Sequence, residues 1–196
     1  VETESHGDAA KLTAAFRHIG GFDLDVTITI TASRTDRLSD WSLSLRNNAG
    51  LLIADVQFPF ILLADDLSGK VGTESVLWPI GPGVLLRAPK PQDLPPDCQH
   101  TWQLNPENGD CSHYPGYNFA QFLAYYNDRA GIYVACQDSS GFIKQLKPVH
   151  HEPSLRLGIS HIGDWPKQGE RQLEYKVVVG SFTGDWYAAA ALYREW

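Results

Sequence analysis

The residues of this sequence that are best suited to direct chemistry form two pairs, each of one cysteine and one histidine. Cys98 and His100, and again Cys111 and His113, stand two positions apart, so that in a strand each pair would share one face. Four such ligands suit Zn²⁺. The turn residues at 105–109, however, favour hairpin registers that do not bring the two pairs opposite each other. Three interpretations stay open: a metal site, a disulfide between Cys98 and Cys111, and loop residues without either role. We expect no metal and no cofactor.

Two clusters combine histidine with a carboxylate. His150, His151 and Glu152 are consecutive, and His161 precedes Asp164 by three positions. Either set has the acid and base that sugar ring opening requires. Prolines flank the first cluster, which favours solvated loop residues instead. A glycosidase needs two carboxylates on either side of one bond, and no pair of acidic residues stands out, so no catalytic residue is assigned.

Aromatic side chains offer a different route to a sugar, because a flat ring can cover the apolar face of a pyranose. Trp165 lies in a loop of Gly, Asp, Trp and Pro, which makes it the best placed by this argument, and Tyr114 and Tyr117 come next. The alternative for each is ordinary packing in the core or at an interface. These three residues are the candidates for carbohydrate binding.

The elements that position these residues are predicted to be strands. Residues 24–31 alternate strictly between apolar and polar side chains, which is typical of a half-buried strand. Residues 41–46 alternate in the same way, 47–50 have turn composition, and a returning strand is expected at 51–58. Pro59 lacks an N–H group, and therefore marks a strand end or a sheet edge.

The same period of two continues through most of the chain. Further strands are expected at 76–80, 84–87, 119–126, 131–137, 142–146, 155–160 and 173–179. With short connections, about ten such strands are most economically buried as antiparallel sheets packed face to face. The predicted fold class is all-β, and Cys136 is expected to be a small buried residue.

The last segment has helical periodicity. Trp186, Ala190, Tyr193 and Trp196 recur at helical spacing, and Asp185 is well placed to stabilise the helix start. No Gly or Asn follows to close the helix. Its aromatic side chains either fold back onto the sheets or join this domain to another one. Trp186, Tyr193 and Trp196 are the candidates for that domain interface.

Composition excludes some functions. The chain has 196 residues, a formal net charge of −7 and 43% apolar residues, which suffices for a packed core. No run of Lys or Arg provides a footprint for nucleic acid or an anionic membrane surface. The apolar stretches are shorter than a membrane span requires. The absence of Met suggests a piece cut from a longer reading frame or residues omitted from the sequence. The compartment is left open.

Several motifs, in this order, resemble a known family. They are the strand at 55–59 ending in Phe-Pro, Trp78 with Pro79, Tyr114 with Pro115 leading into 121–124, the segment 131–138, and the ending at 184–189 and 193–196. This arrangement resembles the N-terminal β-supersandwich, of galactose-mutarotase-like type, that precedes a TIM barrel in an uncharacterised group of glycoside-hydrolase-like proteins.

The resemblance implies a division of the chain and a role. Residues 1–183 would form the supersandwich and 184–196 the helix leading into the barrel, which would hold the catalytic carboxylates. It also implies a sugar contact at Asp138, although Gln137 stands where family members carry His. The expected function is a non-catalytic domain that supports the barrel and contributes a substrate loop. The alternatives are a stand-alone carbohydrate-binding module and a mutarotase-like aldose epimerase.

Overall fold

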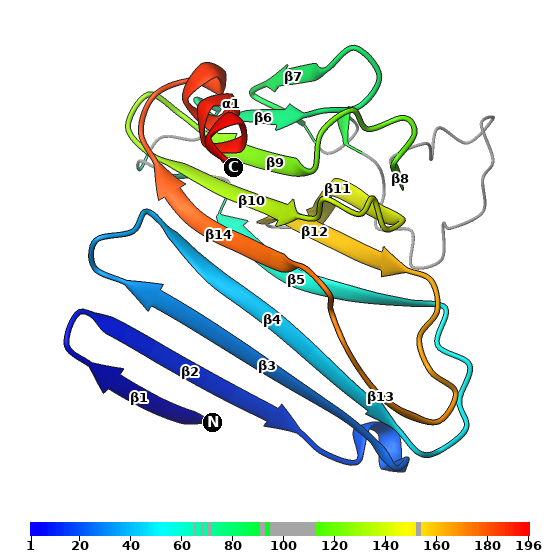
Figure 1. Ribbon diagram of the computed structural model, residues 1–196. Helices are drawn as coiled ribbons and strands as arrows, with labels where there is room; N and C mark the ends of the chain where they lie inside the picture. Colours follow the sequence, from blue (N-terminus) through cyan, green and yellow to red (C-terminus); the bar gives the residue numbers. More distant parts are fainter. Residues whose placement is uncertain (65, 68, 70–71, 91–92, 95–112, 152–153) are drawn as a thin grey trace.

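Two antiparallel sheets form the protein. The computed structural model describes residues 1–64, 66–67, 69, 72–90, 93–94, 113–151 and 154–196, without the side chains of residues 150 and 151. Within these residues one sheet has ten strands and the other has four (Figure 1). The all-β prediction, with sheets packed face to face and a C-terminal helix, is confirmed.

The large sheet runs in the order β1-β2-β3-β4-β14-β10-β9-β6-β7, and β13 pairs with β4 beside this path. Its strands are β1 (Glu2–His6), β2 (Ala9–Phe16), β3 (Leu24–Ser33), β4 (Leu38–Asn47), β6 (Ser75–Trp78), β7 (Val84–Arg87), β9 (Phe122–Tyr126), β10 (Gly131–Gln137), β13 (Gly169–Gln172) and β14 (Lys176–Phe182). A short 3-10 turn, η1 (Ile19–Gly21), joins β2 to β3.

The small sheet has the order β5-β12-β11-β8. Its strands are β5 (Asp55–Ala64), β8 (His113–Tyr114), β11 (Lys144–His151) and β12 (Ser154–Ile162). Leu146, Leu157 and Ile159 point from this sheet into the space between the layers and are fully buried. Strong hydrophobic burial on one face fixes which side chains of each strand point inward.

The strand expected at 51–58 was placed too early. β5 begins at Asp55 and continues through Pro59 to Ala64, so the proline does not end it. β5 lies at the edge of the small sheet, and its pairing with β12 shifts register between Gly158 and Ser160. Both conditions tolerate a residue without an N–H donor, which is why the strand passes through Pro59.

The expectation that 41–46 and 51–58 return on each other was also wrong. β4 pairs with β3, β13 and β14, whereas β5 pairs with β12 in the other sheet. The buried Asn47 side chain donates hydrogen bonds to the carbonyl oxygens of Leu51 and Pro166, at 2.8 and 2.9 Å. The turn at 47–50 therefore carries the chain from one sheet to the other.

The large sheet is covered on both faces over part of its area. Its inner face meets the small sheet in the main core, where Val134, Cys136 and Val177 are fully buried. Helix α1 (Trp186–Glu195) packs against the outer face, burying Ala189 and Leu192 beside Phe122. The helix starts where the sequence predicts, and the Asp185 carboxylate accepts the Tyr187 N–H at 3.0 Å.

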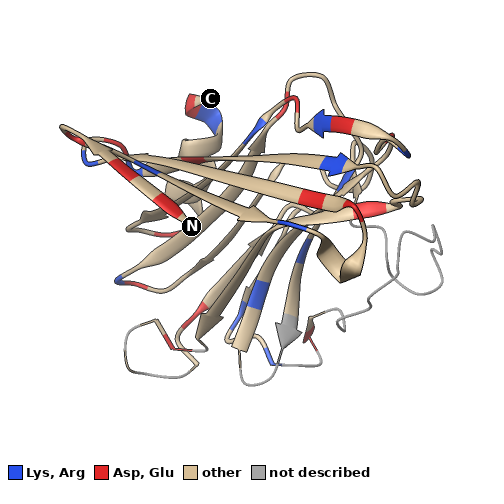
Figure 2. Cartoon of the chain, turned by 90° about the horizontal axis from the view of Figure 1, so that it is seen from below, with Lys and Arg blue, Asp and Glu red and all other residues tan. Residues whose placement is uncertain are grey.

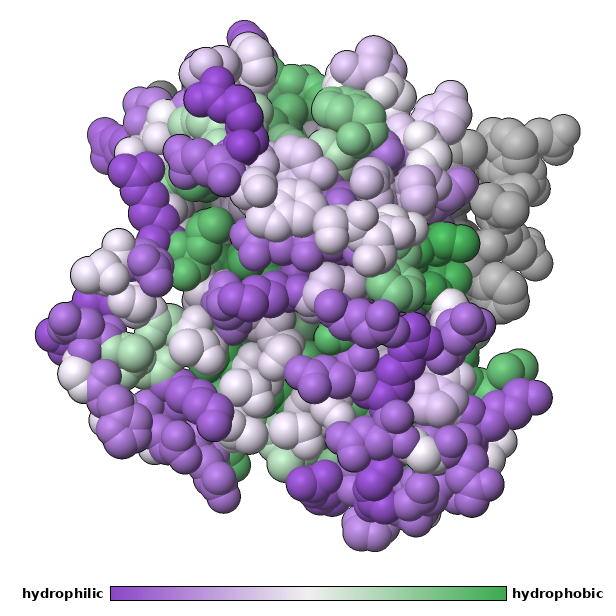
Figure 3. All heavy atoms as spheres, viewed as in Figure 1, coloured by the Kyte–Doolittle hydropathy of each residue, from purple (hydrophilic) through white to green (hydrophobic). Residues whose placement is uncertain are grey.

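Charged, polar and apolar groups are mixed over the parts of the molecule that Figures 2 and 3 show. Lys and Arg are scattered among Asp and Glu over many strands (Figure 2). In the view of Figure 3, polar groups predominate over the lower strands and apolar groups reach the surface near α1 and β7. Among the described residues, no helix has the length and apolar character needed to cross a bilayer.

Candidate functional site

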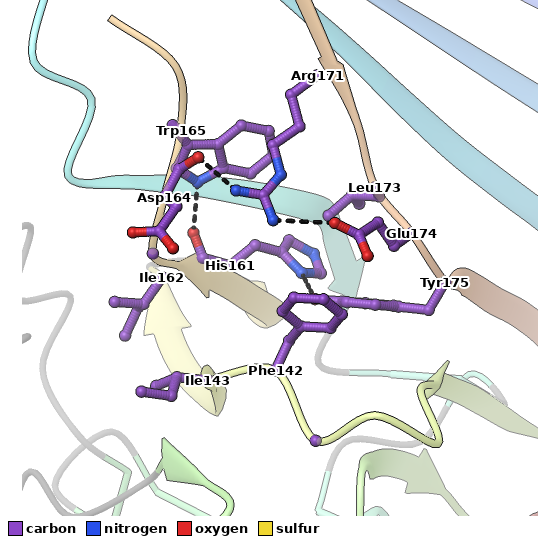
Figure 4. Close-up of a pocket in the computed structure, with 12 residues that line it drawn as sticks. Phe142, Ile143, His161, Ile162, Asp164, Trp165, Arg171, Leu173, Glu174 and Tyr175 are labelled. Carbon is purple, nitrogen blue, oxygen red and sulfur yellow. Dashed lines mark hydrogen bonds and ion pairs between the residues drawn. The ribbon is translucent and has the colours of Figure 1, made fainter.

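A pocket of about 340 Å³ lies where three segments meet at one end of the sandwich (Figure 4). Residues 141–143 come before β11, and residues 161–165 end β12 and enter the next loop. Residues 171–175 include the end of β13 and the connection from β13 to β14. Its volume is at the lower end of the range for small-molecule sites, about 300–1,000 Å³. Trp165, predicted from the sequence, lines this pocket.

Buried hydrogen bonds hold the pocket floor in place. The His161 ring nitrogens lie 2.5 Å from the Phe58 carbonyl oxygen and 2.5 Å from the Tyr175 hydroxyl. Because a carbonyl only accepts, Nε2 carries the proton and Nδ1 accepts from Tyr175. Burial lowers the pKa of His161 to about 4, so the ring is neutral at pH 7. The Trp165 indole N–H donates to the His161 carbonyl oxygen at 3.0 Å.

The alternative in which His161 and Asp164 act as an acid–base pair is not supported. Although both residues line the pocket, His161 is 2% exposed and both of its ring nitrogens already have partners inside the protein. A ring held in this way has no nitrogen with which to exchange a proton with a substrate. His161 is therefore a structural residue.

Arg171 and Glu174 form the polar side of the pocket. The Arg171 guanidinium donates to the Asp164 carbonyl oxygen and, at 3.2 Å, to Glu174 Oε1. Its central carbon lies 6.0 Å from the ring centres of both Phe142 and Trp165, a cation–π geometry. Figure 4 shows the guanidinium below the Trp165 ring, with Glu174 at its outer end. A donor and an acceptor are thus held side by side.

Asp138 lies behind the pocket. Its carboxylate accepts the backbone N–H groups of Ser140, Gly141 and Phe142, and forms an ion pair with Lys144 at 2.5 Å. The residue is 2% exposed, so the sugar contact implied by the resemblance has no route to this carboxylate in the described structure. Asp138 instead fixes the loop that presents Phe142 to the pocket.

The two tyrosine candidates lie elsewhere. Tyr114, in β8, is half-buried, and the Lys144 ammonium lies 5.1 Å from its ring centre. Tyr117 is 57% exposed, and its carbonyl oxygen accepts the Gly81 N–H at the turn between β6 and β7. Neither residue lines the pocket, so the structure does not bring the predicted aromatic residues together in one site.

The three candidates for a domain interface lie on α1. Trp186 and Trp196 are each 48% exposed. Tyr193 is half-buried, with its ring 5.2 Å from that of Phe122 on the sheet and 5.6 Å from that of Trp196. One side of the helix therefore folds back on the large sheet, while both tryptophans remain open to solvent.

The remaining chemical candidates fall largely outside the described residues. Cys98, His100, Cys111 and Glu152 are not described, nor are the side chains of His150 and His151. Cys136 is fully buried, as predicted, and burial raises the pKa of its thiol to about 12. Among the residues that the structure does describe, no three His, Cys, Asp or Glu side chains gather as metal ligands would.

Comparisons with known proteins agree on the fold. No protein-family model and no curated protein matches the sequence. A solved α-N-acetylgalactosaminidase from Bifidobacterium bifidum matches 99% of this chain and 29% of its own length, with a TM-score of 0.69 and 13% identity. A GH36 α-galactosidase from Geobacillus stearothermophilus matches 99% of this chain and 27% of its own length, with a TM-score of 0.53 and 13% identity.

The chain has the fold of the N-terminal β-sandwich domain of glycoside hydrolases. This β-sandwich domain spans less than a third of either matched chain. The predicted likeness to a sandwich domain of glycoside-hydrolase-like proteins is confirmed at the level of the fold.

Sequence reasoning missed the polar side of the pocket in this β-sandwich domain. Arg171 and Glu174 belong to segments whose local patterns indicate only strand and turn, and Phe142 was predicted as an ordinary strand residue. The local signals were the loop that carries Trp165 and the nearby His161 and Asp164, all of which line the pocket. The position of Arg171 between two aromatic rings depends on the packing of three distant segments, and no local pattern encodes it.

Proposed function

We propose that this chain is a non-catalytic β-sandwich domain of a glycoside-hydrolase-like protein and that it supports a catalytic TIM barrel. The observation that carries the proposal is a structural match over 99% of this chain that covers only 27–29% of two much longer glycosidase chains. Residues 1–183 are the sandwich in this proposal, and residues 184–196 form the connecting helix. The catalytic carboxylates belong to the barrel.

The surface of α1 supports the proposed contact with the barrel. The helix buries Ala189 and Leu192 but leaves Trp186 and Trp196 half exposed. Aromatic side chains of this size are enriched at interfaces, where a buried tryptophan contributes strongly to binding. A neighbouring domain that covered both rings would remove their apolar area from water. This burial would stabilise the contact by about 25 cal/mol for each Å² buried.

The test begins with the complete reading frame. Under this proposal, about 200 to 300 residues or more of alternating strand and helix continue beyond Trp196. The longer protein and this chain are then compared by hydrogen exchange, and the α1 amides are expected to exchange more slowly in the longer protein because the barrel covers the helix. A reading frame that stops at Trp196, or equal exchange in both proteins, would contradict the proposal.

Substitutions locate the interface. Trp186→Ser and Trp196→Ser are expected to lower the melting temperature of the longer protein while changing that of the isolated chain little, because both rings are half exposed there. Phe16→Ser is the matched control, since Phe16 is 51% exposed and lies in β2, at the other end of the large sheet from the strands that α1 covers. Hydrolysis of an α-galactoside and an α-N-acetylgalactosaminide is measured alongside, and this chain alone should hydrolyse neither. Equal effects of all three substitutions would argue against docking through α1.

A second candidate function is carbohydrate binding by this chain itself. The pocket bounded by Trp165, Arg171 and Glu174 is the observation that supports it. The two functions are compatible, because the pocket opens on the side of the core between the sheets, whereas α1 packs on the outer face of the large sheet.

A further inference from the structure

The pocket beside Trp165 has two walls of different character. Phe142, Ile143 and Ile162 form an apolar wall, and Ile143 is 53% exposed. Arg171 and Glu174 form the polar side. In Figure 4 the two isoleucines lie on the opposite side of the pocket from Glu174. A ligand that fills this space must therefore be apolar on one side and polar on the other.

The polar side also has hydrogen-bonding capacity that the protein leaves unused. Arg171 has five N–H donors, and two of them bond to Asp164 and Glu174. The Glu174 side chain is 59% exposed and uses only Oε1 in the pair. Arg171 and Glu174, placed side by side, therefore present charged donors and a charged acceptor, and hydrogen bonds to charged groups are the stronger ones.

Charge narrows the class of ligand further. The Arg171 guanidinium is already paired with the Glu174 carboxylate, so the polar side carries no surplus positive charge for an anion. A phosphate or carboxylate ligand would have to displace Glu174 from Arg171. A neutral, hydroxylated ring avoids that cost, because hydroxyl groups both donate and accept.

We propose that this pocket binds a pyranose ring, with two adjacent hydroxyls bonded to Arg171 and Glu174 and the C–H face against Phe142, Ile143 and Ile162. The inference rests on the second candidate function, carbohydrate binding by this chain, and is independent of the proposed supporting role. The pocket is lined by the segments at 141–143, 161–165 and 171–175, none of which belongs to α1.

The pocket walls are held before a ligand arrives. Asp138 accepts three N–H groups from the loop that carries Phe142. His161 holds Tyr175, and Trp165 is bonded to the His161 carbonyl oxygen. Such preorganisation lowers the entropy cost of binding, since few side chains must be ordered when the sugar enters.

The test uses the 196-residue chain and a panel of methyl pyranosides of the gluco, galacto and manno configurations. Binding is followed by calorimetry and by the NMR signal of the Trp165 indole N–H, which reports on the pocket itself. At least one pyranoside is expected to shift that signal in a saturable way. Absence of a shift with every pyranoside at millimolar concentrations would overturn the proposal.

Three variants examine the polar contacts. Arg171→Met is expected to weaken binding about tenfold or more, and Glu174→Gln by roughly threefold to tenfold, because both remove hydrogen bonds to a charged group. Arg129→Met, at an exposed arginine outside the pocket, should bind like the parent chain. Unchanged affinity in a folded Arg171→Met variant would overturn the proposal. If that variant does not fold, unchanged affinity in Glu174→Gln does so, because Glu174 is mostly exposed.

A competing occupant is tested in the same assay. N-acetyl-leucine amide stands for an apolar side chain supplied by another protein segment. Tighter binding of this amide than of every pyranoside would mean that the pocket receives an apolar side chain, and this too would overturn the proposal. Neither result bears on the docking of α1, which is measured by hydrogen exchange in the longer protein.

Discussion

Lys144 and Asp138 form an ion pair whose side chains are 0% and 1% exposed. Such a pair persists only where other polar groups replace the lost water. The Lys144 ammonium also donates to Gln121 Oε1 at 3.0 Å and to the Phe142 carbonyl oxygen at 2.6 Å. Rings of Tyr114 and Tyr175 lie 5.1 and 4.7 Å away. The loop that shapes the pocket therefore depends on a fully enclosed lysine.

Replacing this lysine should be costly. Lys144→Met leaves the Asp138 carboxylate buried without its cation, and we expect a loss of about 3–5 kcal/mol in the free energy of unfolding. The exposed pair of Lys176 and Asp40, 62% and 43% exposed, provides the control. Lys176→Met should cost at most about 1 kcal/mol, because water screens that pair. Urea denaturation measures both, and similar losses for the two variants would contradict this account.

At the scale of the elements, close packing between neighbouring strands limits the size of the side chain that some strand positions can accept. Gly180 in β14 pairs with Leu38 in β4, where a Cβ atom would collide with the Arg37 carbonyl oxygen and approach Leu38 Cδ2 to 2.6 Å. Gly158 in β12 has more room, since a Cβ there would meet only Arg156 Nε at 3.6 Å. Neither glycine has a positive φ, so space and not backbone conformation distinguishes them.

This difference predicts opposite tolerance to alanine. Gly180→Ala must push β14 away from β4, and is expected to lower the free energy of unfolding by about 1–3 kcal/mol or more. Gly158→Ala should change it by less than about 1 kcal/mol, because the new methyl group makes ordinary contacts and alanine restricts the unfolded chain. Thermal unfolding followed by circular dichroism compares the variants. Equal stability of the two would show that β14 and β4 are less tightly apposed than described.

At the scale of the whole molecule, hydrogen bonds of His161 help to join the small sheet to the large sheet. From β12, its Nε2–H group bonds to Phe58 in β5, and its Nδ1 accepts from Tyr175 in the segment that leads into β14 of the large sheet. Burial lowers the pKa of His161 from 6.5 to about 4. Between those pH values the unfolded chain binds a proton that the folded protein does not, so acidification favours unfolding.

The pH dependence of stability follows from this difference. We expect His161 to cost the folded state about 3 kcal/mol as the pH falls from 6.5 to 4, measured by urea denaturation at several pH values. His161→Gln keeps a donor and an acceptor but does not titrate, so its stability should fall less over this range. His6→Gln, at an exposed histidine of β1, should follow the parent chain. Parallel pH profiles for the parent chain and His161→Gln would refute the prediction.

Much of the architecture could be predicted from local patterns. The alternation at 24–31 specifies β3, and helical spacing with Asp185 as the cap specifies the start of α1, because both signals lie within one element. The prediction of a strand at 173–179 is confirmed only in part. Residues 173–175 precede the strand and line the pocket, and β14 begins at Lys176.

Local sequence patterns predict an all-β chain with an aromatic C-terminal helix and an acidic composition, because side-chain periodicity and charge are local properties. Three features appear only when the chain is folded: β4 and β5 join different sheets, Asp138 is enclosed with Lys144, and Trp165, Arg171 and Glu174 border one pocket. These outcomes depend on which apolar faces are buried against each other. That choice is made by the free energy of packing the whole chain, and no window of neighbouring residues contains it.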